Sequence, residues 1–376
     1  MNPLFWGTFD LGKPRVRILL QGLKKNDIIP IIIHKDIWDD VEDKSQVKSN
    51  RAKLVKILRF LMAYPILIMR YLFAPKHDVV VVSYLGHFDI LLVWFFAKLR
   101  RKKIVWDAFL SLYNTVVEDR KLVSKNSLTA KALYALEWLA CRAADTIILD
   151  THAHGEYFAT TYSLPREKVR TVFVGAELEK FPSIKHKRDG QKKQLDVLFY
   201  GQFIPLHGIS VIHEAALLLK DEDINWTIIG EGQMADSFAN ALEVKPLNKL
   251  NWIRWVQYEE LVAQIHNADI CLGIFGDTEK ASRVIPNKVF QILSAGAPLV
   301  TMDSPAIREI FTKPCSGVKL CEAGNAEDLA DKILQMKAEL ASLSLPAHAA
   351  LRNVISPSSI GKAMERICMD TIHGKQ

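Results

Sequence analysis

The chain has 376 residues, enough for two domains of ordinary size that each bury a core. It is 49% hydrophobic and 24% charged, which excludes an intrinsically disordered protein and predicts a globular one. The formal net charge is +7, and seven Lys or Arg but no acidic residue lie in Lys48–Lys76. No nucleic-acid-binding motif accompanies this charge, so a nucleic acid partner is not expected.

The five cysteines are scattered along the chain without a CxxC pair, and four of them lie in apolar or helical settings. This pattern predicts buried free thiols in a reducing compartment. The first residues, Met1–Gly7, lack the basic start and the long apolar run of a signal peptide. We therefore expect a cytoplasmic protein.

In chain order, the first predicted elements form a β-α-β unit. A short strand from Leu4 runs into a loop with Gly7 and Gly12, followed by a helix over Arg15–Asn26 and a strand over Ile29–His34. Glycine directly after a strand lets a ligand approach the backbone closely. An ordinary strand-to-helix turn has the same pattern, so this unit alone does not define a site.

The next segment, Leu54–Phe73, is apolar and long enough to span a bilayer. Three Lys or Arg residues within it argue against spanning, because each costs about 2.5–3.5 kcal/mol near the membrane centre. Pro65 also breaks the run. The basic, aromatic and leucine-rich composition of 48–76 favours a position in the headgroup layer of an anionic leaflet, with Lys98–Lys103 on the same face. The alternative is a core helix with solvated ends.

Two strands of the first half end in polar residues. One buried strand ends at Gly86 and His87, the next ends at Asp107, and a polar loop over Tyr113–Arg120 follows. The carboxyl ends of strands are where an open α/β sheet binds its ligands, so both ends are candidate sites. The alternative is that Asp107 caps a following helix.

A helix over Thr129–Ala144 and a strand over Thr146–Asp150 precede His152 and His154. The spacing of these histidines is poor for joint metal ligation on a helix, so we expect surface or inter-domain side chains and no metal. The polar run Lys185–Gln194 predicts a linker.

The second half holds the most informative stretch, Ala281–Pro305. Pro286 begins a short helix, which a small-residue turn and a buried strand follow. This arrangement directs backbone N–H groups and a helix N-terminus to one point, which favours an anion such as a diphosphate. Arg283 and Lys288 would add positive charge. An ordinary helix-strand unit with two surface cations would show the same pattern.

Three predicted strands, beginning near Asp196, Trp226 and Ala268, precede this stretch, and the first two end in glycine turns. Their order and spacing resemble the C-terminal half of the retaining glycosyltransferases of the GT-B fold, the large family four of nucleotide-sugar-dependent enzymes. The resemblance extends over nearly the whole chain. It implies an α/β protein with two Rossmann-like domains whose parallel sheets face a central cleft.

By resemblance, residues 1–180 form an acceptor-binding domain, residues 181–355 bind the nucleotide sugar, and residues 356–376 form a helix that packs back on the first domain. The implied reaction moves a sugar from a nucleotide sugar to a hydroxyl of a glycan or lipid-linked acceptor with retention, in polysaccharide or glycoconjugate biosynthesis. No Asp-x-Asp motif lies at a strand end, so a metal-independent reaction is expected. The rivals are a nucleotide-sugar epimerase of the same fold and a non-catalytic scaffold at a membrane surface.

The resemblance also implies which residues contact the donor. Relatives carry Arg and Lys where Gln202 and His207 stand, and a pair of glutamates where Arg283 and Gln291 stand. These departures remove fixed charge and leave the identity of the donor sugar open. The implied donor contacts are Gly7, Thr8, Gly201, Gln202, His207, Gly230, Glu231, Arg254, Val256, Asn287, Val289 and Gln291.

Asp107 stands where many relatives carry a histidine, so it is interpreted as a polar group near the sugar or the acceptor hydroxyl, or as a base. With Arg283 and Lys288 it completes the implied catalytic set. The residues implied on the acceptor side are Lys13, Arg15, His87, Glu118 and Arg120.

Overall fold

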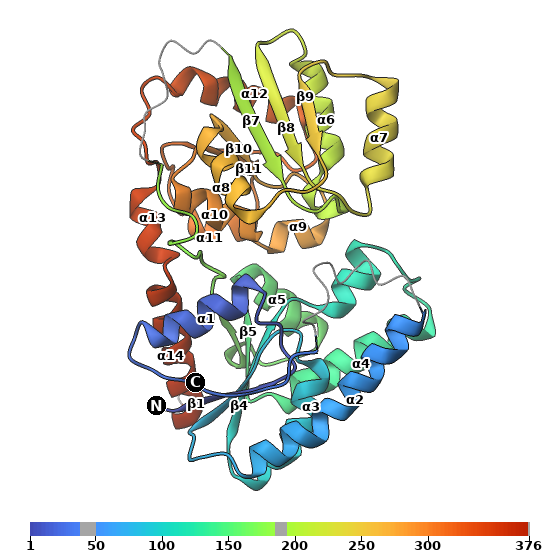
Figure 1. The fold of residues 1–376 in the computed structure, drawn as a ribbon, viewed down its shortest axis with the longest axis vertical. Helices are drawn as coiled ribbons and strands as arrows, with labels where there is room; N and C mark the ends of the chain where they lie inside the picture. The colour runs from blue at the N-terminus through green and yellow to red at the C-terminus, as the bar shows by residue number, and fades with distance from the viewer. Residues whose placement is uncertain (38–49, 185–193, 375–376) are drawn as a thin grey trace. The chain divides into compact units, whose positions relative to one another are not determined.

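The computed structural model describes residues 1–37, 50–184 and 194–374, without the side chains of 50–58 and 61. It divides into two compact units, each with its own six-stranded sheet (Figure 1). The first unit comprises Met1–Val117, Val123–Val174 and Pro357–Gln376, and the second comprises Glu118–Leu122 and Gly175–Ser356. The chain therefore returns to the first unit at its end. Most of the predicted linker 185–194 lies outside the described residues.

The sheet of the first unit has the strand order β2-β1-β3-β4-β5-β6, and all neighbouring strands are parallel. Its central strands are almost entirely buried, as expected for a parallel sheet covered on both faces. The strands are β1 (Pro3–Gly7), β2 (Ile31–His34), β3 (Val79–Val82), β4 (Lys103–Phe109), β5 (Thr146–Leu149) and β6 (Val169–Thr171).

Helices cover both faces of this sheet. Neighbours α2, α3 and α4 pack together on one side, and α1 packs on the C-terminal helix α14 on the other (Figure 1). Glycine at the crossing, Gly22 and Gly361, allows α1 and α14 to approach closely. The helices are α1 (Pro14–Lys24), α2 (Asn50–Leu72), α3 (His87–Leu99), a π-helix (Asn114–Asp119), α4 (Leu128–Ala143), α5 (His152–Thr161), a 3₁₀ turn (Arg166–Lys168) and α14 (Pro357–His373).

The sheet of the second unit has the order β12-β11-β10-β7-β8-β9 and is also parallel. Its strands are β7 (Leu195–Tyr200), β8 (Ile224–Ile229), β9 (Leu250–Ile253), β10 (Ile270–Leu272), β11 (Leu299–Met302) and β12 (Val318–Cys321). Its helices are a 3₁₀ turn (Pro205–His207), α6 (Ile209–Leu218), α7 (Ala235–Val244), α8 (Tyr258–Asn267), α9 (Glu279–Arg283), α10 (Asn287–Ala295), α11 (Pro305–Ile310), α12 (Ala326–Glu339) and α13 (Ala349–Val354).

The prediction that Pro65 breaks the apolar run was wrong, because α2 continues through it. The buried side chains of Ala63, Tyr64, Leu67 and Tyr71 anchor this helix to the core, and that packing offsets the one missing backbone hydrogen bond. The opposite side of α2 is exposed. None of the helices in the described part of the chain combines the length and hydropathy needed to cross a bilayer.

Candidate functional site

Two adjacent strands of the second unit end in glycine at the same edge of the sheet. Gly201 follows β7 and Gly230 follows β8, and α10 begins beside them with Asn287 after Pro286. Gly201 has φ +143°, and a Cβ added there would lie 2.8 Å from Nζ of Lys288. The positive φ therefore favours glycine at this turn, and the amine of Lys288 lies close to it.

The Lys288 side chain lies in the first turn of α10 and is 5% exposed. Its Nζ lies 3.8 Å from the centroid of the Phe199 ring, and it has no hydrogen-bond partner in the described part of the protein. Burial lowers the pKa of this amine well below its usual value. A buried amine with unused donors next to a glycine turn and a helix N-terminus fits an anionic ligand, which would restore its charge.

His207 and Gln202, which stand where relatives carry Lys and Arg, are bonded to each other. The imidazole Nδ1 of His207 contacts the backbone oxygen of Gln202. Burial, with a smaller contribution from Lys288, lowers the pKa of His207 well below its usual value. The imidazole is therefore neutral near pH 7 and supplies no fixed positive charge.

Arg283 and Gln291, the residues at the positions of the glutamate pair, each have a partner. Arg283 ends α9 and pairs with Glu279 four residues earlier. The hydroxyl of Tyr200 donates to Oε1 of Gln291 at 3.1 Å. Of the two predicted cations, Lys288 is therefore the one placed at the glycine turn, and Val289 beside it is buried in the core.

The end of β8 carries the second predicted glycine turn. The indole N–H of Trp252 donates to the carbonyl of Gly230 at 2.9 Å. The carboxylate of Glu231 pairs with Arg254 at 2.7 Å, and the guanidinium of Arg254 lies over the Trp252 ring. Both charged side chains are well exposed, and Val256 nearby in sequence is half-buried. Polar and charged side chains therefore lie at the end of β8, next to β7 and its Gly201 turn.

Asp107 and Arg15, which the resemblance places near the acceptor, bind each other. Both are buried, and a bidentate ion pair joins them with a shortest distance of 2.7 Å. Arg15 also donates to the carbonyls of Val172 and Phe173. Asp107 lies within β4 and does not cap a helix. The fold itself accounts for both side chains, so neither the capping nor the base role is needed to explain them.

Gly7 and Thr8 at the end of β1 hold a carboxyl group that the sequence did not indicate. The backbone N–H of Thr8 donates to Asp89 at 2.8 Å, and the hydroxyl of Tyr64 donates to the same carboxyl at 2.9 Å. A Cβ on Gly7 would collide with Asp89 at 2.2 Å. Burial raises the pKa of Asp89. No spacing rule links a strand end to α2 and α3, so only the fold reveals this cluster.

His87, also predicted on the acceptor side, is buried at the start of α3. Its Nε2 lies 3.0 Å from Glu137, and its Nδ1 lies 2.6 Å from the carbonyl of Leu85. Glu137 also accepts hydrogen bonds from Ser111 and Tyr162. His87 is thus a structural link between α3 and α4.

The remaining predicted residues lie at the surface or in the second unit. Lys13 precedes α1. Glu118 and Arg120, flanked in sequence by residues of the first unit, belong to the second, where the guanidinium of Arg120 approaches Gln202. His154, expected at the surface or between domains, is buried and bonds Asp150 at 2.7 Å. In the described residues no group of three or more His, Cys, Asp or Glu is arranged to hold a metal ion.

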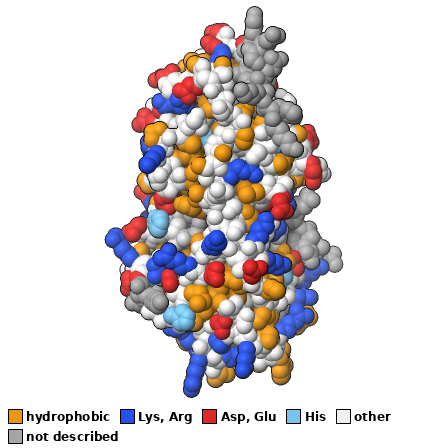
Figure 2. All heavy atoms as spheres, turned by 90° about the vertical axis from the view of Figure 1, so that its left-hand side faces the viewer, with side chains coloured by type: hydrophobic (Ala, Val, Ile, Leu, Met, Phe, Trp, Pro, Cys, Tyr) orange, Lys and Arg blue, Asp and Glu red, His pale blue; other side chains and the backbone are white. Residues whose placement is uncertain are grey.

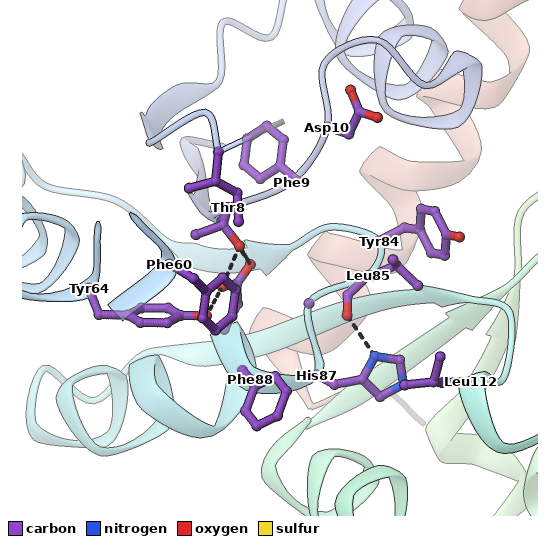
Figure 3. Close-up of a pocket in the computed structure, with 13 residues that line it drawn as sticks. Thr8, Phe9, Asp10, Phe60, Tyr64, Tyr84, Leu85, His87, Phe88 and Leu112 are labelled. Atoms are coloured by element: carbon purple, nitrogen blue, oxygen red, sulfur yellow. Dashed lines mark hydrogen bonds between the residues drawn. The ribbon is translucent and has the colours of Figure 1, made fainter. Parts of the chain in front are cut away.

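A cavity of about 300 Å³ lies in the first unit at the carboxyl ends of its strands (Figure 3). It is lined mainly by aromatic and aliphatic side chains from the loops after β1, β2, β3 and β4 and from α2 and α3. Its apolar walls are Phe9, Ile37, Phe60, Tyr64, Tyr84, Leu85, Phe88 and Leu112.

Comparison with known proteins supports the two-unit architecture. Residues 194–339 match the family model described as Glycosyl transferases group 1. No curated protein matches the chain.

Similar solved structures cover almost the whole chain. Sucrose-phosphate synthase from Thermosynechococcus elongatus has a TM-score of 0.70 at 12% identity, covering 100% of this chain and 99% of that one. Anabaena Alr3699/HepE, solved with UDP-glucose, has a TM-score of 0.66 at 13% identity. The match covers 98% of this chain and 100% of that one. The lipopolysaccharide outer core galactosyltransferase WaaB has a TM-score of 0.63 at 14% identity, covering 100% of both. The chain thus has the GT-B fold, and residues 194–339 resemble the glycosyl transferases group 1 family.

Proposed function

We propose that the protein transfers a sugar from a nucleoside diphosphate sugar to a hydroxyl of a glycan or lipid-linked acceptor, with retention and without a metal, in polysaccharide or glycoconjugate biosynthesis. The second unit binds the donor, and Lys288, Gly201 and the first turn of α10 receive its diphosphate. The observation that carries this proposal is the buried Lys288 amine, which has no hydrogen-bond partner in the described structure. The UDP-glucose complex of HepE, a structure with the same fold, supports a uridine nucleotide.

The chemistry follows from the charge that develops in the reaction. The bond between the anomeric carbon and the β-phosphate oxygen breaks, the acceptor oxygen bonds to the same face of that carbon, and its proton passes to the departing phosphate. Negative charge grows on the diphosphate as it leaves. The bound anion favours the ammonium form of Lys288, which takes up a proton from solvent. This ammonium and the backbone N–H groups of α10 stabilise that charge in place.

Binding of UDP tests this assignment directly. UDP should raise the melting temperature of the wild-type protein with saturable dependence on concentration, and Lys288→Met should abolish most of the shift. Methionine is unbranched, apolar and one atom shorter than lysine, so it suits the buried site and the variant should fold. Lys332→Met, a partly exposed change on α12, is the matched control and should keep the full shift. A wild-type protein without saturable protection by any nucleoside diphosphate would instead support the scaffold alternative.

We further propose that the first unit binds an anionic membrane surface at the cytoplasmic face. Two neighbouring helices each expose an apolar stripe with spacing i, i+4, i+7, i+11, and together these stripes form what we call the apolar ridge. An exposed apolar area of this extent marks an interaction site. The ridge consists of Met62, Ile66, Met69 and Phe73 at α2, and Phe88, Leu92, Phe95 and Leu99 at α3.

Cations accompany the ridge, which favours a lipid surface over a protein partner. Exposed basic residues lie on α2, at the end of α3 and between α3 and the start of β4: Arg59, Arg70, Lys98, Arg101 and Lys103. Each cation near an anionic leaflet contributes about 1 kcal/mol. On the face drawn in Figure 2, by contrast, basic side chains are scattered among acidic ones.

Vesicle sedimentation tests the membrane proposal. The protein should bind vesicles of phosphatidylglycerol and phosphatidylcholine, bind phosphatidylcholine alone more weakly, and lose affinity as salt increases. Phe95→Gln with Met69→Gln should reduce binding roughly tenfold or more, since both changes remove exposed apolar area. Leu218→Gln, an exposed change on α6, is the control. Equal binding of all variants would contradict the proposal.

A further inference from the structure

The apolar cavity of the first unit has its polar groups already satisfied. The hydroxyl of Thr8 and the hydroxyl of Tyr64 bond the carboxyl of Asp89, and both nitrogens of His87 have partners. Within the described structure, no lining residue has a buried polar side-chain atom without a hydrogen bond. A sugar or a phosphate would therefore find little to bind on these walls, because a polar ligand must exchange its water for protein hydrogen bonds.

The shape of the cavity suits a narrow apolar ligand. Its volume of about 300 Å³ is at the lower end of the range for small-molecule sites. The rings of Phe60 and Tyr64 meet edge to face at 4.8 Å, and those of Phe60 and Phe88 meet at 5.8 Å, so aromatic rings form a continuous wall (Figure 3). Such a wall favours a flexible hydrocarbon.

The cavity is continuous with the apolar ridge. Phe88 lines the cavity, is 52% exposed, and begins the α3 stripe of the ridge. Phe60 and Tyr64 lie on α2, whose exposed stripe starts at Met62. A hydrocarbon chain that leaves a bilayer at the ridge would therefore contact aromatic side chains along its path into the cavity.

We propose that this cavity holds one hydrocarbon chain of the acceptor, so that the acceptor is a membrane lipid or a lipid-linked glycan whose chain is drawn from the bilayer past Phe88. This inference rests on the proposed function and deepens it, because it names the class of acceptor. The cavity lies at the carboxyl ends of β1 and β3, where an α/β sheet places its ligands. The chain would hold the acceptor at this edge of the sheet.

Calorimetric titration with hexyl to decyl β-glucosides below their micelle concentrations tests the proposal. Because each buried methylene adds a constant increment, affinity should rise about fourfold per added carbon and then level off when the cavity is full. Geranyl glucoside distinguishes an isoprenoid from a straight chain, and tight binding of either supports the proposal. Phenyl glucoside carries an aromatic group in place of the hydrocarbon chain on the same glucose. If it binds as tightly as the tightest-binding alkyl glucoside, the proposal is overturned.

Two variants locate the bound chain. Phe88→Gln should lower the affinity for decyl glucoside roughly tenfold. Leu139 lies on α4, is 48% exposed and does not line the cavity, so Leu139→Gln should leave this affinity unchanged. Leu112→Trp, which fills the cavity with added bulk, should have the same effect as Phe88→Gln. No binding by the wild type, no levelling off with chain length, or equal weakening by the Leu139 control would each overturn the proposal.

The same preparations separate this inference from the proposed function. UDP protection reports on the second unit, and alkyl glucoside binding reports on the first. If UDP protects and the glucosides do not bind, the cavity assignment fails alone. If the glucosides bind and UDP does not protect the protein against thermal unfolding, the transferase assignment fails. The interpretation of the bound hydrocarbon as part of an acceptor then fails with it.

Discussion

Burial of the Lys288 amine, which has no hydrogen-bond partner in the described structure, favours its neutral form. In the proposed function, this property links binding of the donor diphosphate to pH. Its low pKa arises from burial. A diphosphate that binds beside it favours the ammonium form, so binding takes up a proton. The contribution of Lys288 to binding should therefore decrease as pH rises.

The affinity for UDP should accordingly fall as pH rises, and titration calorimetry in buffers of different ionisation heat should detect proton uptake. In Lys288→Met the proton uptake should disappear along with most of the affinity. If wild type and variant exchange the same number of protons on binding UDP, Lys288 is not the group that contacts the anion.

Stability of the free protein should show the opposite trend with pH. Unfolding exposes Lys288 and lets it bind a proton up to its ordinary pKa near 10.4, so the unfolded state binds more protons. This contribution makes the unfolding free energy rise with pH, by at most about 1.4 kcal/mol per pH unit. Lys288→Met should therefore be more stable than wild type at neutral pH, with a difference that shrinks towards pH 10. Denaturant unfolding at several pH values measures it.

The Arg15–Asp107 pair gives a second prediction at the scale of single residues. Both side chains are within 1% of full burial, so removing one leaves an uncompensated charge in the core. Arg15→Ala should lower the unfolding free energy by about 3–5 kcal/mol, whereas Arg15→Met combined with Asp107→Leu should lose much less. Denaturant melts compare the three proteins. Unchanged stability of Arg15→Ala would mean that the pair serves the reaction and not the fold.

Among the elements, α14 depends on a close helix crossing. A Cβ added to Gly361 would lie 2.1 Å from the backbone of Gly22 on α1, so Gly361→Ala must push the two helices apart. We expect a loss of about 1–3 kcal/mol in unfolding free energy. Lys362→Ala, an exposed neighbour, is the control and should change stability little. Equal melting temperatures for both variants would show that the crossing is loose.

The amphipathic character of α2 explains how one segment supports two interpretations. The sequence suggested either a membrane-surface segment or a core helix, and the structure shows one buried face and one exposed apolar face. Its buried side chains join the core of the first unit, and its other side carries half of the apolar ridge. A helix with apolar residues on both faces cannot be assigned from composition, because only the packed fold shows which face has a partner.

For the molecule as a whole, the last helix belongs to the unit that contains the first strand. Deleting residues 357–376 removes α14, whose buried Ile360, Met364 and Ile367 pack in the first unit. The first unit should lose more than about 5 kcal/mol from this burial, while the second unit keeps its UDP protection. Scanning calorimetry with and without UDP should show two unfolding transitions in the truncated protein. The transition of the first unit should shift to lower temperature relative to the full chain, and that of the second unit should be unchanged. Loss of UDP protection in the truncated chain would indicate that the units do not fold independently.

Much of the architecture was available from the sequence alone. Short buried strands alternating with helices predict parallel sheets, and glycine turns after Tyr200 and Ile229 mark the strand ends that face a ligand. The departure of Arg283 and Gln291 from the glutamate pair was also visible. These features are local, because spacing and turn chemistry act within a few residues.

Only the tertiary structure decided which side chains meet. It paired Arg15 with Asp107 across 92 positions, bonded Asp89 to Thr8 and Tyr64, and buried the Lys288 amine beside Gly201. It also joined the cavity to the apolar ridge through Phe88. Such contacts are set by how distant strands and helices pack, and a side chain's burial, charge state and free donors follow from that packing and not from its neighbours in the chain.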